Sequence, residues 1–198
     1  MVKVEFWVPQ AARDDVKAAV RAIVTDSTRS PALAPRRRSP TSTDITPGAD
    51  HHMDAVIETA WTVPAIKTAL DASSLIREGE MTLRVLEGAE PVLLATMHEY
   101  GDLPVYLSVG GAQIVCSVLL WPVSEQADAA RFNEFLLKAQ RVVPLSNFAI
   151  TSVGGEDVYE LMGELSCKTT LQTILIELRT LAENAIDATS LRETFDAA

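Results

Sequence analysis

The fold is decided by the stretch WPVSEQADAARFNEFLLKAQRVVPLSNFAITSV (residues 121–153) and its continuation YELMGELSCKTTLQTILIELRTLAENAIDA (residues 159–188). The first segment has apolar residues at helical spacing and then alternates, so it predicts a helix followed by a strand. Gly154-Gly155 predicts a hairpin turn, because glycine takes the positive φ that tight turns require. The second segment predicts a return strand and a helix over about 169–187, whose wide apolar stripe must be buried.

Upstream of this stretch the pattern is first helical and then alternating. Helical spacing holds over 53–61 and 65–77, on either side of Pro64. Gly110-Gly111 predicts another two-residue turn, and the connections between strands are too short for parallel crossovers. The sequence therefore predicts an α+β fold, in which a β-meander, a helix, a β-hairpin and a helix form an antiparallel sheet packed with helices. The meander strands are expected at 81–86, 92–97, 105–109 and 114–121, and the last of these, apolar on both faces, is expected in the centre of the sheet.

The chain divides into four parts. Residues 1–25 predict a small βα extension, which would act as a dimerisation arm or pack on the main domain. Residues 26–52 are rich in Ser, Thr and Pro and predict a flexible linker. The α+β domain then spans 53–188, and residues 189–198 are expected to form a C-terminal tail, although Leu191 and Phe195 could extend the last helix into it. The helix of the extension would have an apolar face made of Ala12, Val16, Ala19, Val20 and Ile23.

The charge is unevenly distributed along the chain. The whole sequence of 198 residues has a net charge of −10, whereas residues 1–50 carry eight Lys/Arg and six Asp/Glu, so the remainder carries −12. Such an acidic body repels nucleic acid and anionic lipid and would suit a basic partner. The apolar runs are too short to span a bilayer, and the N-terminus lacks the features of a signal peptide. We therefore expect a cytoplasmic protein with no direct membrane insertion, in which Cys116 and Cys167 are free buried thiols.

The sequence contains no motif that specifies a reaction. The glycine pairs lack the residues that a phosphate loop requires, and His51-His52 has no further ligand nearby. Glu99 and Asp102 could form an acid/base pair, but turn chemistry explains Asp102 more simply. We expect no enzyme, no cofactor and no metal site.

Several large apolar residues are candidates for partner binding. The aromatic residues are interpreted as either core or interface, and Trp121, which precedes a proline at a strand end, could anchor a partner. The terminal helix offers the widest apolar stripe of the chain. The candidate partner-binding residues are Tyr100, Trp121, Phe132, Phe135, Leu178 and Leu181.

The motifs also resemble a known family. EYGDLPVYLSV at 99–109, WPVSE at 121–125, FNEFLLKAQRVVPLSNFAITSV at 132–153 and YELMGELS at 159–166, with the terminal helix, resemble the YjfI-like bacterial family of unknown function. The resemblance covers about 65–188, so residues 1–50 are an addition. It implies an association with proteins of the PspA/Vipp type, which are helical, polymerising, ESCRT-III-like proteins that remodel membranes. The order of elements is also similar to YbjN-like and type III secretion chaperone folds, which bind partner proteins.

Together these features favour a non-enzymatic adaptor or chaperone-like protein. It would bind a partner protein, such as a PspA/Vipp-like protein, and regulate its assembly. The sequence also allows the chain to form a homodimer. One alternative is a DNA-binding regulator, since the strand and helix of residues 1–25 resemble the first half of a ribbon-helix-helix protomer, although no clean second helix follows. The other alternative is an enzyme acting on a small molecule.

Overall fold

A computed structural model describes residues 59–196. The predictions for residues 1–58 lie outside this range. They concern the βα extension with its ribbon-helix-helix resemblance, the linker with His51-His52, and the start of the helical stretch at 53–61. The α-helices within 59–196 are α2 (Val63–Asp71), α3 (Ser74–Arg77), α4 (Ala129–Ala139) and α5 (Leu171–Asp196). The strands are β1 (Met81–Leu86), β2 (Val92–Met97), β3 (Leu103–Gly110), β4 (Gln113–Pro122), β5 (Asn147–Val153) and β6 (Glu156–Ser166). Short 3-10 turns are η2 (His98–Tyr100), η3 (Val123–Glu125) and η4 (Gln140–Val142).

The six strands form one antiparallel sheet in the order β1-β2-β3-β4-β6-β5. The predicted α+β fold is thereby confirmed, with its meander, helix, hairpin and helix in the expected sequence. Strand β4 lies between β3 and β6, as its apolar character on both faces predicted. The hairpin joins the sheet through its return strand β6, so β5 is left as an edge strand.

The two glycine turns differ in how well the sequence located them. Gly154 and Gly155 both have positive φ, at 62° and 84°, and connect β5 to β6 as predicted. The prediction of a Gly110-Gly111 turn is wrong by one residue. Gly110 still pairs with Gln113, and the turn consists of Gly111 and Ala112. Because two glycines are adjacent, the sequence alone allowed the two-residue turn to start at either of them. The pairing of β3 with β4 fixes the start at Gly111.

The helix expected over 65–77 is broken in two. Helix α2 begins at Val63, where the Thr62 side chain accepts a hydrogen bond from the Ala65 N–H at 3.3 Å, and Pro64 occupies the first turn as predicted. It ends before Ser73, whose extended backbone starts α3. Serine at this position favours a helix start over helix continuation, so the apolar spacing alone overestimated the length.

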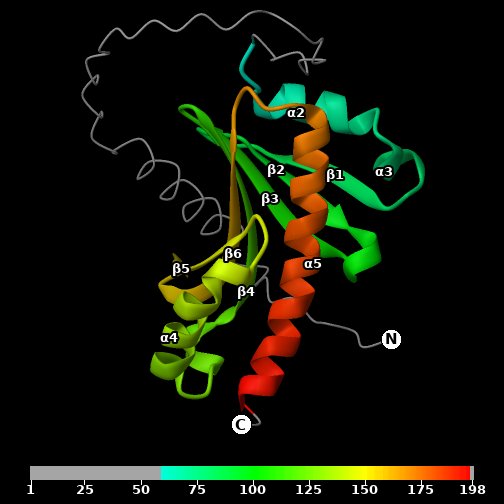
Figure 1. The fold of residues 1–198 in the computed structure, drawn as a ribbon. Helices are drawn as coiled ribbons and strands as arrows, with labels where there is room; N and C mark the ends of the chain where they lie inside the picture. The colour runs from blue at the N-terminus through cyan, green and yellow to red at the C-terminus, as the bar shows by residue number, and fades with distance from the viewer. Residues whose placement is uncertain (1–58, 197–198) are drawn as a thin grey trace, which may run out of the picture.

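The main core lies between one face of the sheet and helices α2 to α5. Figure 1 shows α5 running lengthwise over this face, with α2 across one end and α4 beside the C-terminal turns of α5. A stripe of buried side chains along α5 packs this helix against the sheet. Its fully buried apolar residues are Ile174, Leu178, Leu181, Ala182 and Ala185. None of the helices in the described part of the chain has the length and apolar content to cross a membrane.

The predicted end of the last helix and the predicted tail need correction. We expected the helix to end near 187 and residues 189–198 to form a tail, but α5 continues to Asp196. The last turns are held by side chains. The Phe195 ring lies 4.9 Å from the Phe132 ring, and Arg192 donates from Nη2 to the Glu125 carbonyl oxygen at 2.7 Å. Leu191 and Phe195 are four residues apart, a helical spacing that left an extension of the helix open, whereas their packing partners come from other elements.

Candidate partner-binding surface

An aromatic cluster joins four elements at the α4 end of the sheet. Phe132 of α4 lies at its centre, with ring centroids 5.5 Å from Tyr159 of β6 and 6.2 Å from Trp121 of β4. Phe195 of α5 packs edge-on against Phe132, and Phe135 lies 5.9 Å from Phe195. Burial of such large rings fixes α4 and the end of α5 relative to the sheet. The structure therefore brings together three predicted site residues, Trp121, Phe132 and Phe135.

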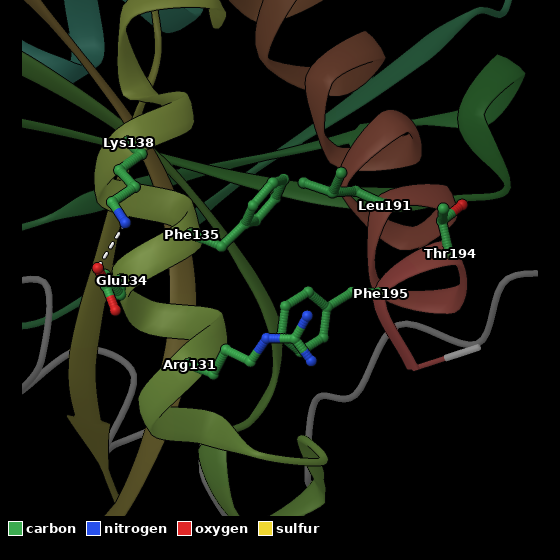
Figure 2. A pocket seen from close by; sticks show the side chains of 7 residues that line it. All are labelled: Arg131, Glu134, Phe135, Lys138, Leu191, Thr194 and Phe195. Carbon is green, nitrogen blue, oxygen red and sulfur yellow. Dashed lines mark hydrogen bonds and ion pairs between the residues drawn. The ribbon is translucent and has the colours of Figure 1, made fainter. Parts of the chain in front are cut away.

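A groove of about 420 Å³ lies above this cluster, between α4 and the last turns of α5. We call it the α4–α5 groove. In Figure 2, Phe135 and Leu191 point toward one another across it, and Arg131 lies over the Phe195 ring. The Arg131 guanidinium carbon is 5.1 Å from that ring centroid, a cation–π distance. Lys138 and Glu134 form an ion pair of 2.5 Å on the α4 side. The groove is lined by Arg131, Glu134, Phe135, Lys138, Leu191, Thr194 and Phe195.

A second hollow of about 300 Å³ lies on the other side of α4, against strand β5. We call it the α4–β5 pocket. Tyr159 closes it, and its hydroxyl donates to Asn133 Oδ1 at 2.6 Å. Burial raises the pKa of the Tyr159 phenol, so the hydroxyl stays protonated and able to donate at neutral pH. The pocket is lined by Asn133, Leu136, Leu137, Phe148, Ala149, Ile150 and Tyr159.

Exposed apolar side chains are concentrated in the segment 137–150, and two of them, Leu137 and Ile150, line this pocket. Of the five large hydrophobic residues that are exposed within 59–196, four lie between 137 and 150, and the fifth, Ile176, is on α5. Adjacent exposed apolar residues mark interaction sites more often than isolated ones do. We call these four the apolar patch: Leu137 (75% exposed), Val142 (81%), Leu145 (61%) and Ile150 (46%).

The backbone under the patch is strained and held in place. Leu145 has a φ of 57°, a left-handed conformation that is unfavourable for a leucine. Asn184 of α5, itself buried, donates from Nδ2 to the Pro144 carbonyl oxygen at 2.8 Å and to Ser146 Oγ at 2.9 Å. These two hydrogen bonds flank Leu145, so the core of the domain fixes the loop that presents its side chain to solvent.

Four of the six predicted binding residues are not available to a partner. Trp121 is 6% exposed, and Phe132, Leu178 and Leu181 are fully buried. In this structure the four side chains belong to the core of the domain, because the strongest apolar stripe of a helix is the part that its own core buries. Phe135 is partly exposed in the α4–α5 groove.

Tyr100, the remaining candidate, lies apart from this surface. It is partly exposed in η2, and its hydroxyl donates to Glu183 Oε1 at 3.4 Å. Burial and the neighbouring Glu183 carboxylate raise the pKa of the phenol. The contact attaches η2 to α5 and leaves Tyr100 outside the apolar patch.

The sequence contained a weak signal for the patch. Leu137 follows Leu136 but falls off the helical stripe that includes Phe132 and Phe135. The sequence predicted a basic partner from the net charge of the whole body, whereas the α4 surface itself has Arg131, Lys138 and Arg141 exposed along α4 and η4. The net charge describes the average electrostatic potential of the whole domain, whereas the affinity of a contact depends on the charged side chains next to it.

The acidic residues of the domain have structural surroundings. Asp102 Oδ1 lies 2.5 Å from His98 Nδ1, and His98 begins η2 instead of continuing the strand. Glu177 is buried on α5, where burial raises the pKa of its carboxyl to about 6 and its Oε1 has no hydrogen-bond partner. Gly163 makes room for it, since a Cβ at Gly163 would lie 1.6 Å from Glu177 Oε1.

The two cysteines and the metal-ligating residues are equally unreactive in arrangement. Cys116 and Cys167 are buried and free, as predicted, and burial raises the pKa of the Cys116 thiol. Within residues 59–196, no three side chains of His, Cys, Asp or Glu form a group that could hold a metal ion.

Comparison with known proteins gives consistent matches to one family. The model of a family described as an uncharacterized protein conserved in bacteria (DUF2170) matches residues 60–196. The uncharacterized protein YjfI of Escherichia coli K12 is 33% identical over 135 residues, which are 68% of this chain and 97% of YjfI. YjfI of E. coli O157:H7 matches with the same values.

Proposed function

The chain belongs to the DUF2170 family of bacterial proteins. From its surface we propose that it is a non-enzymatic adaptor that binds a helical partner protein at α4. The partner we propose is a PspA/Vipp-type protein, whose assembly the adaptor would regulate. The single observation that supports this most is the apolar patch of four exposed large side chains, two of which, Leu137 and Ile150, line the α4–β5 pocket.

The shape and chemistry of the surface favour an amphipathic helix as the bound element. A helix presents apolar side chains at three- and four-residue intervals, and these can enter grooves on a partner while its polar face stays solvated. The α4–α5 groove and the α4–β5 pocket flank α4 and could receive such side chains. Arg131 and Arg141 are exposed beside them, so acidic residues flanking the apolar stripe of the partner would be complementary.

Binding of purified full-length chain to a PspA-type protein tests the proposal. We expect Leu137→Asp to weaken the complex by about tenfold or more, because a charge would be buried at the centre of the contact. Isothermal titration calorimetry would give the dissociation constant, and raising the salt concentration should weaken the complex through the arginines.

Ile176→Asp is the matched control, because Ile176 is an equally large exposed residue on α5 outside the patch. It should leave the dissociation constant unchanged. The proposal fails if the two substitutions weaken binding equally, or if PspA-type proteins do not bind the unaltered chain. In the second case the patch could still be tested against other helical proteins, but the named partner would be wrong.

A further inference from the structure

The sheet has a second apolar face that none of the described helices contacts. Along each strand alternate side chains point to opposite faces. One set belongs to the main core with α2 to α5, and the other forms a separate buried cluster made only of strand residues. We call this second set the reverse face. Its buried members are Val92, Tyr106, Leu119, Val153 and Val158.

These side chains are removed from solvent. All five are 4% exposed or less, although none of the four α-helices within 59–196 contributes to their cluster. Polar groups on the same face are buried as well. Glu160, which pairs with Leu119, is 1% exposed, and Ser117, whose Oγ donates to its carboxylate, is also 1% exposed. A sheet face that carries this much buried apolar and polar surface requires a covering layer.

We propose that residues 10–25 of this chain form an amphipathic helix that covers the reverse face. The sequence supplies the required pattern, because Val16, Val20 and Ile23 fall on one side, while the charged residues Arg13, Asp14, Lys17 and Arg21 lie outside it. Two small residues, Ala12 and Ala19, on the apolar side would allow close approach to the strands. The basic side would face solvent beside the acidic body.

The connection is long enough for the segment to reach. The described chain begins near Trp61, whose backbone N–H donates to the Cys167 carbonyl oxygen at the end of β6. Thirty-three residues (26–58) separate position 59 from the proposed helix. A flexible chain of that length spans about 30 Å on average, which is comparable with the length of β4, about 34 Å for ten residues.

Comparison with the relatives suggests what the segment adds. The 135 matched residues make up 97% of YjfI, so that protein has no room for an additional 58-residue segment. The family match likewise begins at residue 60. The inference goes beyond the proposed function, since the reverse face lies across the sheet from α4. In this chain the segment would reserve a surface that shorter relatives leave open to another molecule.

A thiol on the reverse face tests the proposal in the full chain. Ser108 is two residues from Tyr106 on β3 and 5% exposed, so Ser108→Cys places a reactive group under the proposed helix. The unaltered chain, with its two buried thiols, gives the background. Cys formed at this position should react slowly with a disulfide reagent. Adding Val16→Asp should accelerate the reaction by about tenfold or more, because it opens the cover without unfolding the domain.

Lys17→Asp is the control, because it introduces the same charge on the opposite side of the helix and should leave the slow rate unchanged. Ile23→Asp should repeat the effect of Val16→Asp. Equal rates for the Val16 and Lys17 variants would overturn the proposal, as would fast modification without either substitution. If protection instead increases with protein concentration from about 1 µM to about 100 µM together with the molecular mass, a second copy covers the face and the proposal is wrong.

Discussion

The buried carboxyl of Glu160 should make the stability of the domain depend on pH in a predictable direction. Glu160 is 1% exposed and receives a hydrogen bond from Ser117 Oγ. Loss of hydration raises the pKa of its carboxyl from about 4.5 to about 7, and the Ser117 hydrogen bond only partly offsets this. In the unfolded chain the carboxyl returns to its ordinary value. The folded state therefore binds the proton more tightly than the unfolded state does.

The sign follows from proton linkage. Because the folded pKa is the higher one, stability is fully present below about pH 4.5 and is lost as pH rises through about 7. Above that, ionisation of the buried carboxyl costs the folded state about 3 kcal/mol, an upper value because relaxation would reduce it. Glu160→Gln keeps an acceptor for the Ser117 hydroxyl and cannot ionise. The variant should gain stability relative to the unaltered chain as pH rises, by up to about 3 kcal/mol between pH 4.5 and pH 8.

Urea unfolding followed by tryptophan fluorescence at several pH values would measure this difference. Other groups titrate in the same range, but they are shared by both proteins and cancel in the comparison. Glu164→Gln, on the same strand at an exposed position, is the matched control and should follow the unaltered chain. A Glu160→Gln difference that stays constant from pH 4.5 to pH 8 would refute the reasoning, because it would mean that the carboxyl is as well solvated in the folded state as in the unfolded chain.

Two further predictions concern packing. Gly163→Ala should lower the free energy of unfolding by about 1–3 kcal/mol, since the new Cβ would overlap Glu177. Combining it with Glu177→Ala should cost less than the two separate effects added together. Additive effects would show that the two sites do not touch. Phe195→Ala should cost about 1–2 kcal/mol in urea unfolding, because a partly buried ring leaves the Phe132 cluster. Thr194→Ala, on the preceding exposed position, is its control, and equal effects of the two would mean that the end of α5 does not pack as described.

The sequence predicted the elements better than their partners. Alternation, or an apolar run between turn residues, located the six strands, and Gly154-Gly155 located the hairpin, because these signals are local. The gap between α2 and α3 was missed, and the end of α5 was placed near 187, with an extension through Leu191 and Phe195 left as an alternative. Phe195 and Arg192 extend α5 through contacts with Phe132 and Glu125, which lie more than 60 residues away in the chain. Such contacts leave no periodic signal around the residues that make them.

The candidate surface was predicted least well, for a related reason. Sequence periodicity selected Leu178 and Leu181 because they are apolar and regularly spaced, and the same regularity let the core bury them. The patch residues Leu137, Val142 and Leu145 are irregularly spaced, since they follow a helix end and a strained loop. An apolar residue outside the periodic stripe of its element is therefore the better indicator of an interface in this fold.

The apolar character of β4 on both faces links the domain to the segment that precedes it. A strand of this kind requires layers on both sides of the sheet. Helices α2 to α5 supply one layer, and they do so entirely from residues within the family match. The burial of Leu119 and Val158 requires the other layer, and of the two helical patterns expected from the sequence upstream of 59, the amphipathic one at 10–25 has the length to cross several strands. Destabilising that segment should therefore expose the reverse face while the α4 surface keeps its structure, which separates the two proposed interfaces experimentally.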